Sequence, residues 1–205
     1  MYAQLLIGIS FAIAAYQDVR ERAVSDLVWA PALAGVGYIF YTMLAATNPG
    51  LWGLIAKVGL LGGIAIAFAY FGAIGQADAI AMAFIAADPY PLSPIPPLFA
   101  AASVALGHIG YEFAVGNARG GLTIPIERFL KEQRWIPKAI VADGVRKEID
   151  SDVNLAREEV EAKQTPGALV EVRYGVPTVA YLGIGYAAYL VYLLAFNQAA
   201  FLGLP

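Results

Sequence analysis

Residues 51–78 read LWGLIAKVGLLGGIAIAFAYFGAIGQAD, an apolar run that ends in the polar sequence Gly75-Gln76-Ala77-Asp78. About 20 mainly apolar residues are needed for a helix to cross roughly 30 Å of hydrocarbon, and this run exceeds that length. An ionised carboxylate is costly beside hydrocarbon, so an acid in this position marks a candidate functional site. The stretch therefore predicts a membrane helix and a place for chemistry at its end.

The whole chain has the composition of a membrane protein. Of its 205 residues, 60% are hydrophobic and 14% are charged, and the mean hydropathy is +0.64. A net charge of −3, with no cluster of Lys and Arg interleaved with aromatic residues, argues against a nucleic-acid partner. The absence of cysteine excludes disulfides, thiolate metal sites and cysteine nucleophiles. We expect no metal and no other cofactor.

Further apolar runs divide the chain into spans. They cover residues 2–16, 27–46, 98–115 and 176–196. The first run is not preceded by Lys or Arg and further spans follow it, so we interpret it as a retained span rather than a signal peptide. A shorter apolar segment, residues 79–88, precedes a proline-rich link and ends at Asp88, which we expect to mark its outer end.

The basic residues predict the topology. Arg20 and Arg22 follow the first run and, apart from these two and Lys57, every basic residue lies between positions 117 and 174. Since Lys and Arg in short loops favour the cytoplasm, both loops should be cytoplasmic. An even number of crossings must then separate them, which requires residues 79–88 to act as a short span. We expect Lys57, the exception, to snorkel from its helix.

The resulting fold prediction is an all-α polytopic membrane protein with six transmembrane helices and both termini outside. Residues 1–116 would hold five helices, residues 117–174 a small cytoplasmic α/β domain, and residues 175–205 the last helix and the C-terminus. Periodicity within the cytoplasmic domain predicts a helix, two strands and an acidic helix. These elements cover residues 126–134, 140–145, 168–173 and 152–163, the last being the acidic helix.

Under this topology Asp18 and Asp78 both lie at cytoplasmic helix ends and can share a site. Two carboxylates about 3 Å apart hold one proton between them near neutral pH. The ionised member can take a proton from water while the protonated member donates to a peptide carbonyl. Gly75 allows a tight turn or a close backbone approach, and the small Ala77 leaves the flank of Asp78 open.

These residues resemble those of a known family. Asp18 followed by Arg20-Glu21-Arg22, together with Gly75-Gln76-Ala77-Asp78 and six spans, resembles the archaeal preflagellin and type IV prepilin peptidases. These are membrane aspartyl proteases whose Gly-x-Gly-Asp-type motif is shared with presenilins. The resemblance covers nearly the whole chain, although Ala77 stands where the strict motif has glycine.

The resemblance implies a function and its residues. Asp18 and Asp78 would be the catalytic pair, and Gly75, Gln76 and Ala77 the motif beside the substrate backbone. The enzyme would remove the basic leader from precursors of archaella or type IV pili at the cytoplasmic face of the cell membrane. Pro177, at the start of the last span, matches a proline of family members and would receive substrate. Without cysteine or a glycine-rich cofactor motif, the methyltransferase activity of bacterial relatives is not expected.

Simpler roles remain open for each of these residues. Asp18 can pair with an arginine at a helix end, Asp78 can cap a helix, and Pro177 can occupy a first helical turn. His108 and Glu112 share a helix face and could relay a proton, support the active site or only pack. Two ligands are too few for a structural zinc site.

Three rival functions also remain. Asp18, Asp78, His108 and Glu112 could form the relay of a proton-coupled transporter or channel. The same aspartates could serve a presenilin-like protease that cuts within a transmembrane segment. In a non-catalytic scaffold, replacing either aspartate by asparagine would change stability alone.

Overall fold

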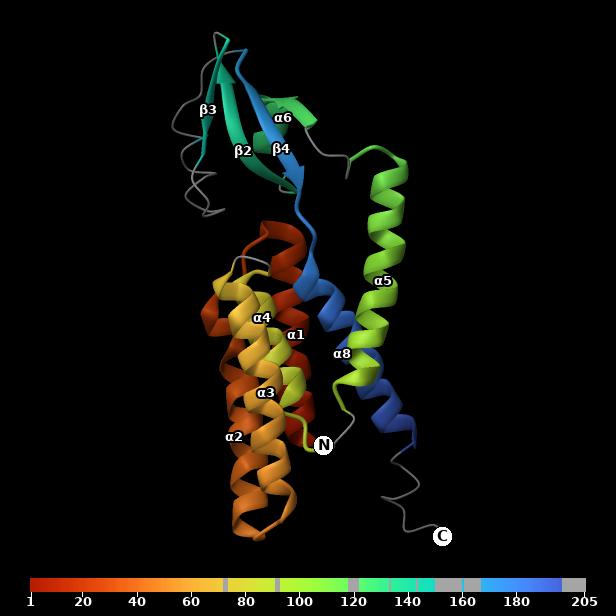
Figure 1. Cartoon of the computed structure of the whole chain (residues 1–205). Coiled ribbons are helices and arrows are strands. Elements are labelled where there is room, and N and C mark those ends of the chain that lie inside the picture. Colours follow the sequence, from red (N-terminus) through yellow and green to blue (C-terminus); the bar gives the residue numbers. More distant parts are fainter. Residues whose placement is uncertain are drawn as a thin grey trace. The chain divides into compact units, whose positions relative to one another are not determined.

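The computed structural model describes residues 1–71, 74–90, 93–117, 122–132, 134–142, 144–149, 160 and 167–196. The chain forms two compact units, both traced in Figure 1. The helical unit comprises Met1–Asp18, Val24–Ala105 and Pro177–Pro205. The sheet unit comprises Val19–Ala23 and Leu106–Val176.

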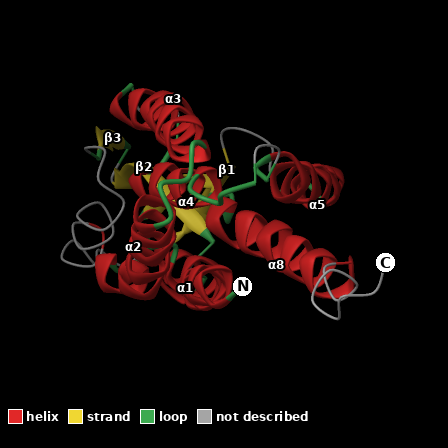
Figure 2. Cartoon of the chain, turned by 90° about the horizontal axis from the view of Figure 1, so that it is seen from below, coloured by secondary structure: helices red, strands yellow, loops and turns green. Residues whose placement is uncertain are grey.

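The helical unit is built around a short central helix. Its elements are α1 (Tyr2–Glu21), η1 (Asp26–Trp29), α2 (Ala30–Ala45), α3 (Gly50–Tyr70), α4 (Gln76–Ala86), α5 (Ile95–Ala114) and α8 (Thr178–Phe196). The ends of α1 and α5 continue into the sheet unit. Viewed along the helices, α4 lies among α1, α2, α3 and α8 (Figure 2).

Aromatic contacts hold this helical core together. Trp29 stacks on Phe84 of α4 with ring centroids 5.4 Å apart, and its edge meets Phe11 of α1 at 5.7 Å. Phe11 in turn stacks on Tyr186 of α8 at 4.9 Å. These four side chains are buried, so the contacts join α1, α4 and α8 to the start of α2.

Three helices are long and apolar enough to cross a membrane: Asp26–Ala45, Gly50–Tyr70 and Thr178–Ala195. They confirm three of the predicted spans and indicate membrane association. Many of their large apolar side chains are exposed, including Trp52 and Phe68, as a lipid-facing surface requires.

The prediction of six spans is not supported by the described residues, since α1, α4 and α5 do not meet the same criteria. The 11 residues of α4 extend about 16 Å at 1.5 Å per residue, roughly half of the hydrocarbon thickness. Polar residues lower the hydropathy of the other two helices, among them Gln17 and Asp18 in α1 and His108 and Glu112 in α5.

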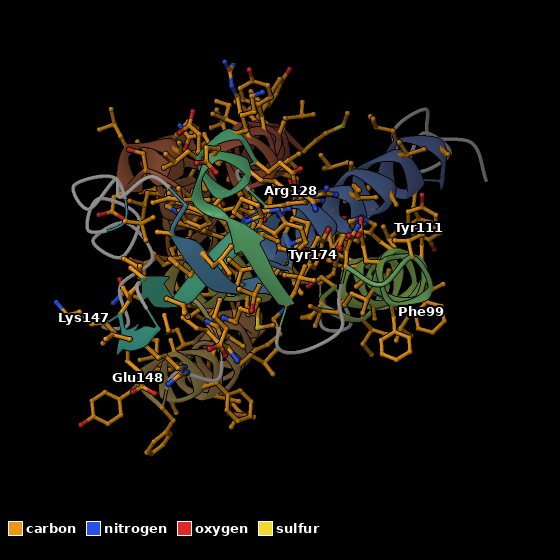
Figure 3. The ribbon with its side chains drawn as sticks, turned by 90° about the horizontal axis from the view of Figure 1, so that it is seen from above. Phe99, Tyr111, Arg128, Lys147, Glu148 and Tyr174 are labelled. Carbon is orange, nitrogen blue, oxygen red and sulfur yellow. The ribbon has the colours of Figure 1, made fainter. Side chains whose placement is uncertain are left out.

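The sheet unit contains a four-stranded antiparallel sheet with strand order β1-β4-β2-β3. Its elements are β1 (Leu122–Pro125), α6 (Ile126–Lys131), β2 (Trp135–Ala142), β3 (Val145–Glu148) and β4 (Leu169–Tyr174). Phe129 of α6 is buried against Trp135, Val170 and Val172. The edge strand β3 is exposed along its length, and its Lys147 and Glu148 point away from the sheet (Figure 3).

The structure confirms some of the elements predicted for residues 117–174 and corrects others. The predicted strand at 168–173 is β4, whereas the predicted helix at 126–134 ends as α6 at Lys131, before the chain extends into β2. The predicted strand at 140–145 is wrong at its end because Gly144, with φ of +77°, lies in the turn between β2 and β3. The predicted acidic helix at 152–163 lies outside the described residues, except for Val160. The strands β1 and β3 were not predicted.

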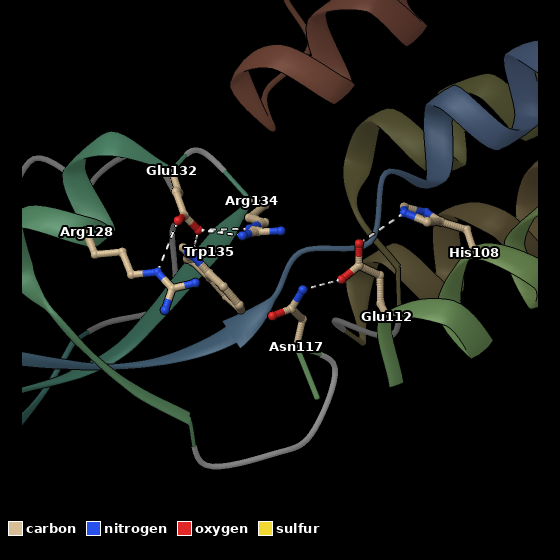
Figure 4. A network of polar contacts seen from close by, with 7 residues as sticks. All are labelled: His108, Glu112, Asn117, Arg128, Glu132, Arg134 and Trp135. Atoms are coloured by element: carbon tan, nitrogen blue, oxygen red, sulfur yellow. Dashed lines mark hydrogen bonds and ion pairs between the residues drawn. The ribbon is translucent and has the colours of Figure 1, made fainter. Parts of the chain in front are cut away.

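Glu132 fixes the junction between α6 and β2. Its Oε2 accepts hydrogen bonds from Trp135 Nε1 at 2.6 Å and from Arg134 Nε at 2.9 Å, and its Oε1 accepts one from Arg128 Nε at 3.0 Å (Figure 4). Trp135 is only 1% exposed. The indole N–H therefore depends on this carboxylate for its hydrogen bond.

We expect Glu132→Ala to lower the free energy of unfolding of the sheet unit by about 1–3 kcal/mol, because the buried indole N–H loses its acceptor. Glu127→Ala is the matched control, since Glu127 lies on α6, just before this junction, and is exposed. The measurement is the rate of limited proteolysis of the full-length protein across a urea gradient. Equal rates for the two variants would show that the Glu132 contacts contribute nothing to stability.

Candidate active site

Asp78 lies in the first turn of α4. Its Oδ2 accepts a hydrogen bond of 3.0 Å from the N–H of Gly75, the residue that caps the helix. This bond satisfies the backbone donor of the N-cap residue. Asp78 is therefore not the N-cap that was considered for it: Gly75 is the N-cap, and Asp78 is the third residue of the helix. Gly75 has an ordinary φ of −71°, and a Cβ at this position would lie 3.2 Å from Asp78 Oδ2. What glycine provides here is space beside the carboxylate.

Asp18 is buried near the end of α1, with 8% of its surface exposed. Its Oδ2 accepts a hydrogen bond of 3.0 Å from the N–H of Ala180, in the first turn of α8. The N–H groups and the dipole at a helix N-terminus stabilise a negative charge. The last helix of the described chain therefore favours an ionised Asp18.

Pro177 is placed by the same helix start. Its carbonyl accepts a hydrogen bond from Tyr181 N–H at 3.2 Å, which is the first turn of α8, and the residue is buried. This is the helix-start role considered for Pro177. A role in receiving substrate remains a prediction.

The two carboxyl groups interact electrostatically within the helical unit. Burial raises the pKa of Asp78 to about 6, the Gly75 hydrogen bond opposes this rise, and the negative charge of Asp18 adds to it. Asp78 lies outside the three candidate spans. Asp78 thus keeps its proton to a higher pH than an ordinary aspartic acid, while Asp18 accepts the hydrogen bond from the start of α8.

The raised pKa of Asp78 predicts a pH-dependent stability. The folded state binds the Asp78 proton more tightly than the unfolded state, so this contribution is complete below about pH 4 and is lost as the pH rises through about 6. We expect the free energy of unfolding to fall by on the order of 1–3 kcal/mol across this window. Thermal unfolding in detergent at a series of pH values measures it. Asp78→Asn should flatten the dependence, and an unchanged slope in that variant would contradict the assignment.

The residues beside Asp78 border an apolar cavity of about 550 Å³ among α2, α3 and α4. Gln76 lines it at the start of α4 and is exposed, and Ala79 follows Asp78 along its wall. Ala77, predicted to leave the flank of Asp78 open, is partly buried and packs against the helical core. Gln76 and Ala79, rather than Ala77, therefore face this cavity.

His108 and Glu112 belong to the sheet unit. His108 Nε2 lies 3.4 Å from Glu112 Oε1, and Glu112 Oε2 accepts a hydrogen bond of 2.7 Å from Asn117 Nδ2 (Figure 4). The Tyr174 hydroxyl lies 3.4 Å from His108 Nε2. The i, i+4 spacing revealed the first pair, but nothing in the sequence marked Asn117 or Tyr174. A supporting role for this group at the aspartates remains a prediction.

Some features of the site have no signature in the sequence. The donor to Asp18 is a backbone N–H of Ala180, which any residue could supply.

Among the residues that the structure describes, no group of three or more His, Cys, Asp or Glu side chains could hold a metal ion. No model of a known protein family, no curated protein and no solved structure matches this chain.

Proposed function

We propose that this chain is a membrane aspartyl endopeptidase that removes a basic leader peptide preceding an apolar helix. The observation that carries the proposal is the pair Asp18 and Asp78: burial raises the pKa of Asp78 to about 6 against the Gly75 hydrogen bond, and the negative charge of Asp18 adds to this rise. The substrates would be precursors of archaella or type IV pili, as the resemblance implies. Cleavage would take place at the cytoplasmic face, with α1, α4 and α5 also crossing the bilayer.

The chemistry needs only the two carboxyl groups and water. Asp18, ionised, takes a proton from water as the water oxygen attacks the scissile carbonyl carbon. Asp78 gives its proton to the carbonyl oxygen, which forms a gem-diol without a covalent enzyme intermediate. The gem-diol then collapses as its hydroxyl proton returns to Asp78, and Asp18 delivers its proton to the departing amide nitrogen.

The apolar cavity beside Asp78 suits the substrate class. Its walls are formed largely by apolar side chains, including Leu33, Ile66 and Ile80. An apolar helix that follows the leader could lie against these walls while the scissile bond reaches Asp78 past Gln76. The substrate would then bind partly from the lipid side, without a deep aqueous cleft.

The test is a cleavage assay in membranes that contain the full chain. The substrate is a precursor with a Lys- and Arg-rich leader before an apolar helix, and mass spectrometry identifies the new N-terminus. We expect one cut at the boundary of leader and helix. A double variant, Asp18→Asn with Asp78→Asn, at equal folded abundance, is the negative control, and a leader with its basic residues changed to Gln tests charge recognition. Cleavage by the double variant would exclude the mechanism.

One observation favours a second candidate, a proton-coupled transporter or channel. Buried polar residues occur well away from Asp18 and Asp78, namely Gln4, Ser10 and Asp88, and such residues mark ion or proton paths in membrane proteins. This candidate predicts proton flux across liposomes that contain the protein, measured with an enclosed pH-sensitive dye. It also predicts no cleavage of any precursor by the wild type.

A further inference from the structure

A second buried polar cluster lies at the end of α4 opposite Asp78. Lys57 of α3 reaches it and donates hydrogen bonds to the carbonyl oxygens of Asp88 at 2.5 Å and Tyr90 at 2.7 Å, and to Ser93 Oγ at 3.1 Å. Among the described residues, no ion pair joins the Lys57 ammonium to the Asp88 carboxylate. Backbone carbonyl oxygens therefore bind the Lys57 ammonium, and the hydrogen-bond donors to the Asp88 carboxylate must be other groups.

Among the described residues, the Asp88 carboxyl accepts one well-formed hydrogen bond, and the Tyr189 hydroxyl and the Gln4 amide lie close to it. Asp88 is 0% exposed, and its Oδ1 accepts a hydrogen bond of 3.0 Å from Tyr90 N–H. Its Oδ2 is buried without a hydrogen-bond partner, and the same holds for Oε1 of Gln4 and the hydroxyl oxygen of Tyr189. A buried carboxylate oxygen and a buried amide oxygen that both lack donors are an uncommon combination in a folded protein.

The groups that face Asp88 come from each helix around it. They are Gln4 from α1, Lys57 from α3, and Tyr186 and Tyr189 from α8. Burial raises the pKa of the Asp88 carboxyl. Four neighbouring groups lower this pKa and offset only part of the rise: the Tyr90 N–H, the Tyr189 hydroxyl, the Lys57 charge and the Gln4 amide. The surroundings therefore favour the neutral acid, although Lys57 lies close by.

One bound proton would satisfy both orphan acceptors. On Asp88 Oδ2 it turns the carboxyl into a donor, and the Oδ2–H can then donate to Gln4 Oε1. Gln4 and Tyr90 of this cluster also line a cavity of about 130 Å³, together with Leu5 and Leu190. This volume holds a few water molecules at roughly 30 Å³ each, which gives the proton a route of exchange.

We propose that Asp88 is a proton-binding site whose Oδ2 carries a proton and shares it with Gln4 Oε1. The site is distinct from the candidate active site, since Asp88 lies ten positions beyond Asp78, about 15 Å along a helix. Loss of the proton would leave a carboxylate that draws Lys57 away from the carbonyls of Asp88 and Tyr90. The protonation state of Asp88 thus decides whether α3 stays tied to the turn that follows α4.

The test is infrared spectroscopy of the full-length protein in lipid nanodiscs, over a pH series in D₂O. The signal is the C=O stretch of a protonated carboxyl group, and Asp78→Asn serves as the background so that Asp78 does not contribute. We expect a band that persists above about pH 4, the ordinary range of a carboxyl group, and that disappears when Asp88→Asn is added. Asp26→Asn, at an exposed position, should leave the band unchanged.

A second variant keeps Asp88 and tests the shared proton. Gln4→Leu removes the acceptor, so the Asp88 band should remain and shift to higher wavenumber. The proposal is overturned if Asp88→Asn leaves the band intact, or if the band disappears as the pH passes through about 4, the ordinary range of a carboxyl group. An unshifted band in Gln4→Leu would overturn the sharing with Gln4.

Discussion

Asp78→Asn is expected to reduce leader cleavage by on the order of 10²–10⁴-fold, the range that a positioned acid or base contributes. Asparagine cannot give a proton to the scissile carbonyl. Its side-chain oxygen can still accept the Gly75 N–H, so the start of α4 should persist and the folded abundance should stay close to that of the wild type. The measurement is the initial rate of cleavage in membranes at matched protein amounts.

Asp18→Asn should cause a similar loss of cleavage for a different reason. It removes the base and also the negative charge at the N-terminus of α8, which adds a stability cost of about 1 kcal/mol. In the wild type, cleavage should decline above about pH 6 as Asp78 loses its proton. Full activity of either single variant would leave the aspartates as helix-capping residues.

Gly185→Ala is expected to lower the free energy of unfolding of the helical unit by about 3 kcal/mol, at the upper end of the usual cost of overpacking. A Cβ at Gly185 of α8 would overlap the carbonyl oxygen of Pro97 and lie 3.1 Å from Ala101 N, both in the first turns of α5. Both obstacles are backbone atoms, so no side chain can move aside. The two helices would have to separate, which close packing through small residues in membranes does not tolerate.

Gly63→Ala is the matched control. Gly63 lies within α3, and among the described residues no atom beyond its chain neighbours and the surrounding helix backbone lies within 4 Å of where its Cβ would be. Since alanine favours helix more than glycine does, this variant should be neutral or slightly more stable. Thermal unfolding in detergent compares the two variants, and equal melting temperatures would contradict the close contact of α8 with the start of α5.

The long apolar helices could be predicted because each carries its signal within its own sequence. Length and hydropathy mark α2, α3 and α8 without reference to any partner. The 11 residues of α4 are different, since charge counting required a crossing that this helix is too short to make by itself. Its central position depends on contacts with four neighbouring helices, and no local sequence pattern indicates these contacts.

The candidate site could be predicted only where side chains carry the information. Asp18 and Asp78 were identified from their positions at the ends of apolar runs. The donor to Asp18 is the backbone N–H of Ala180, and the residue type at that position does not reveal this contact. That Lys57 snorkels from its helix stays a prediction. Its ammonium binds the carbonyls of Asp88 and Tyr90, acceptors that exist only once the turn after α4 has formed.

The hydrogen bond between Asp18 and Ala180 joins positions 162 residues apart in the chain. A ribosome that adds roughly 5–20 residues per second needs about 8–30 s to make the intervening segment. For the last 102 of these residues, about 5–20 s, a nascent chain already holds both aspartates but lacks the helix that orients the first. A peptidase arranged in this way would stay inactive until α8 has been synthesised, and would begin to cut neighbouring precursors only then.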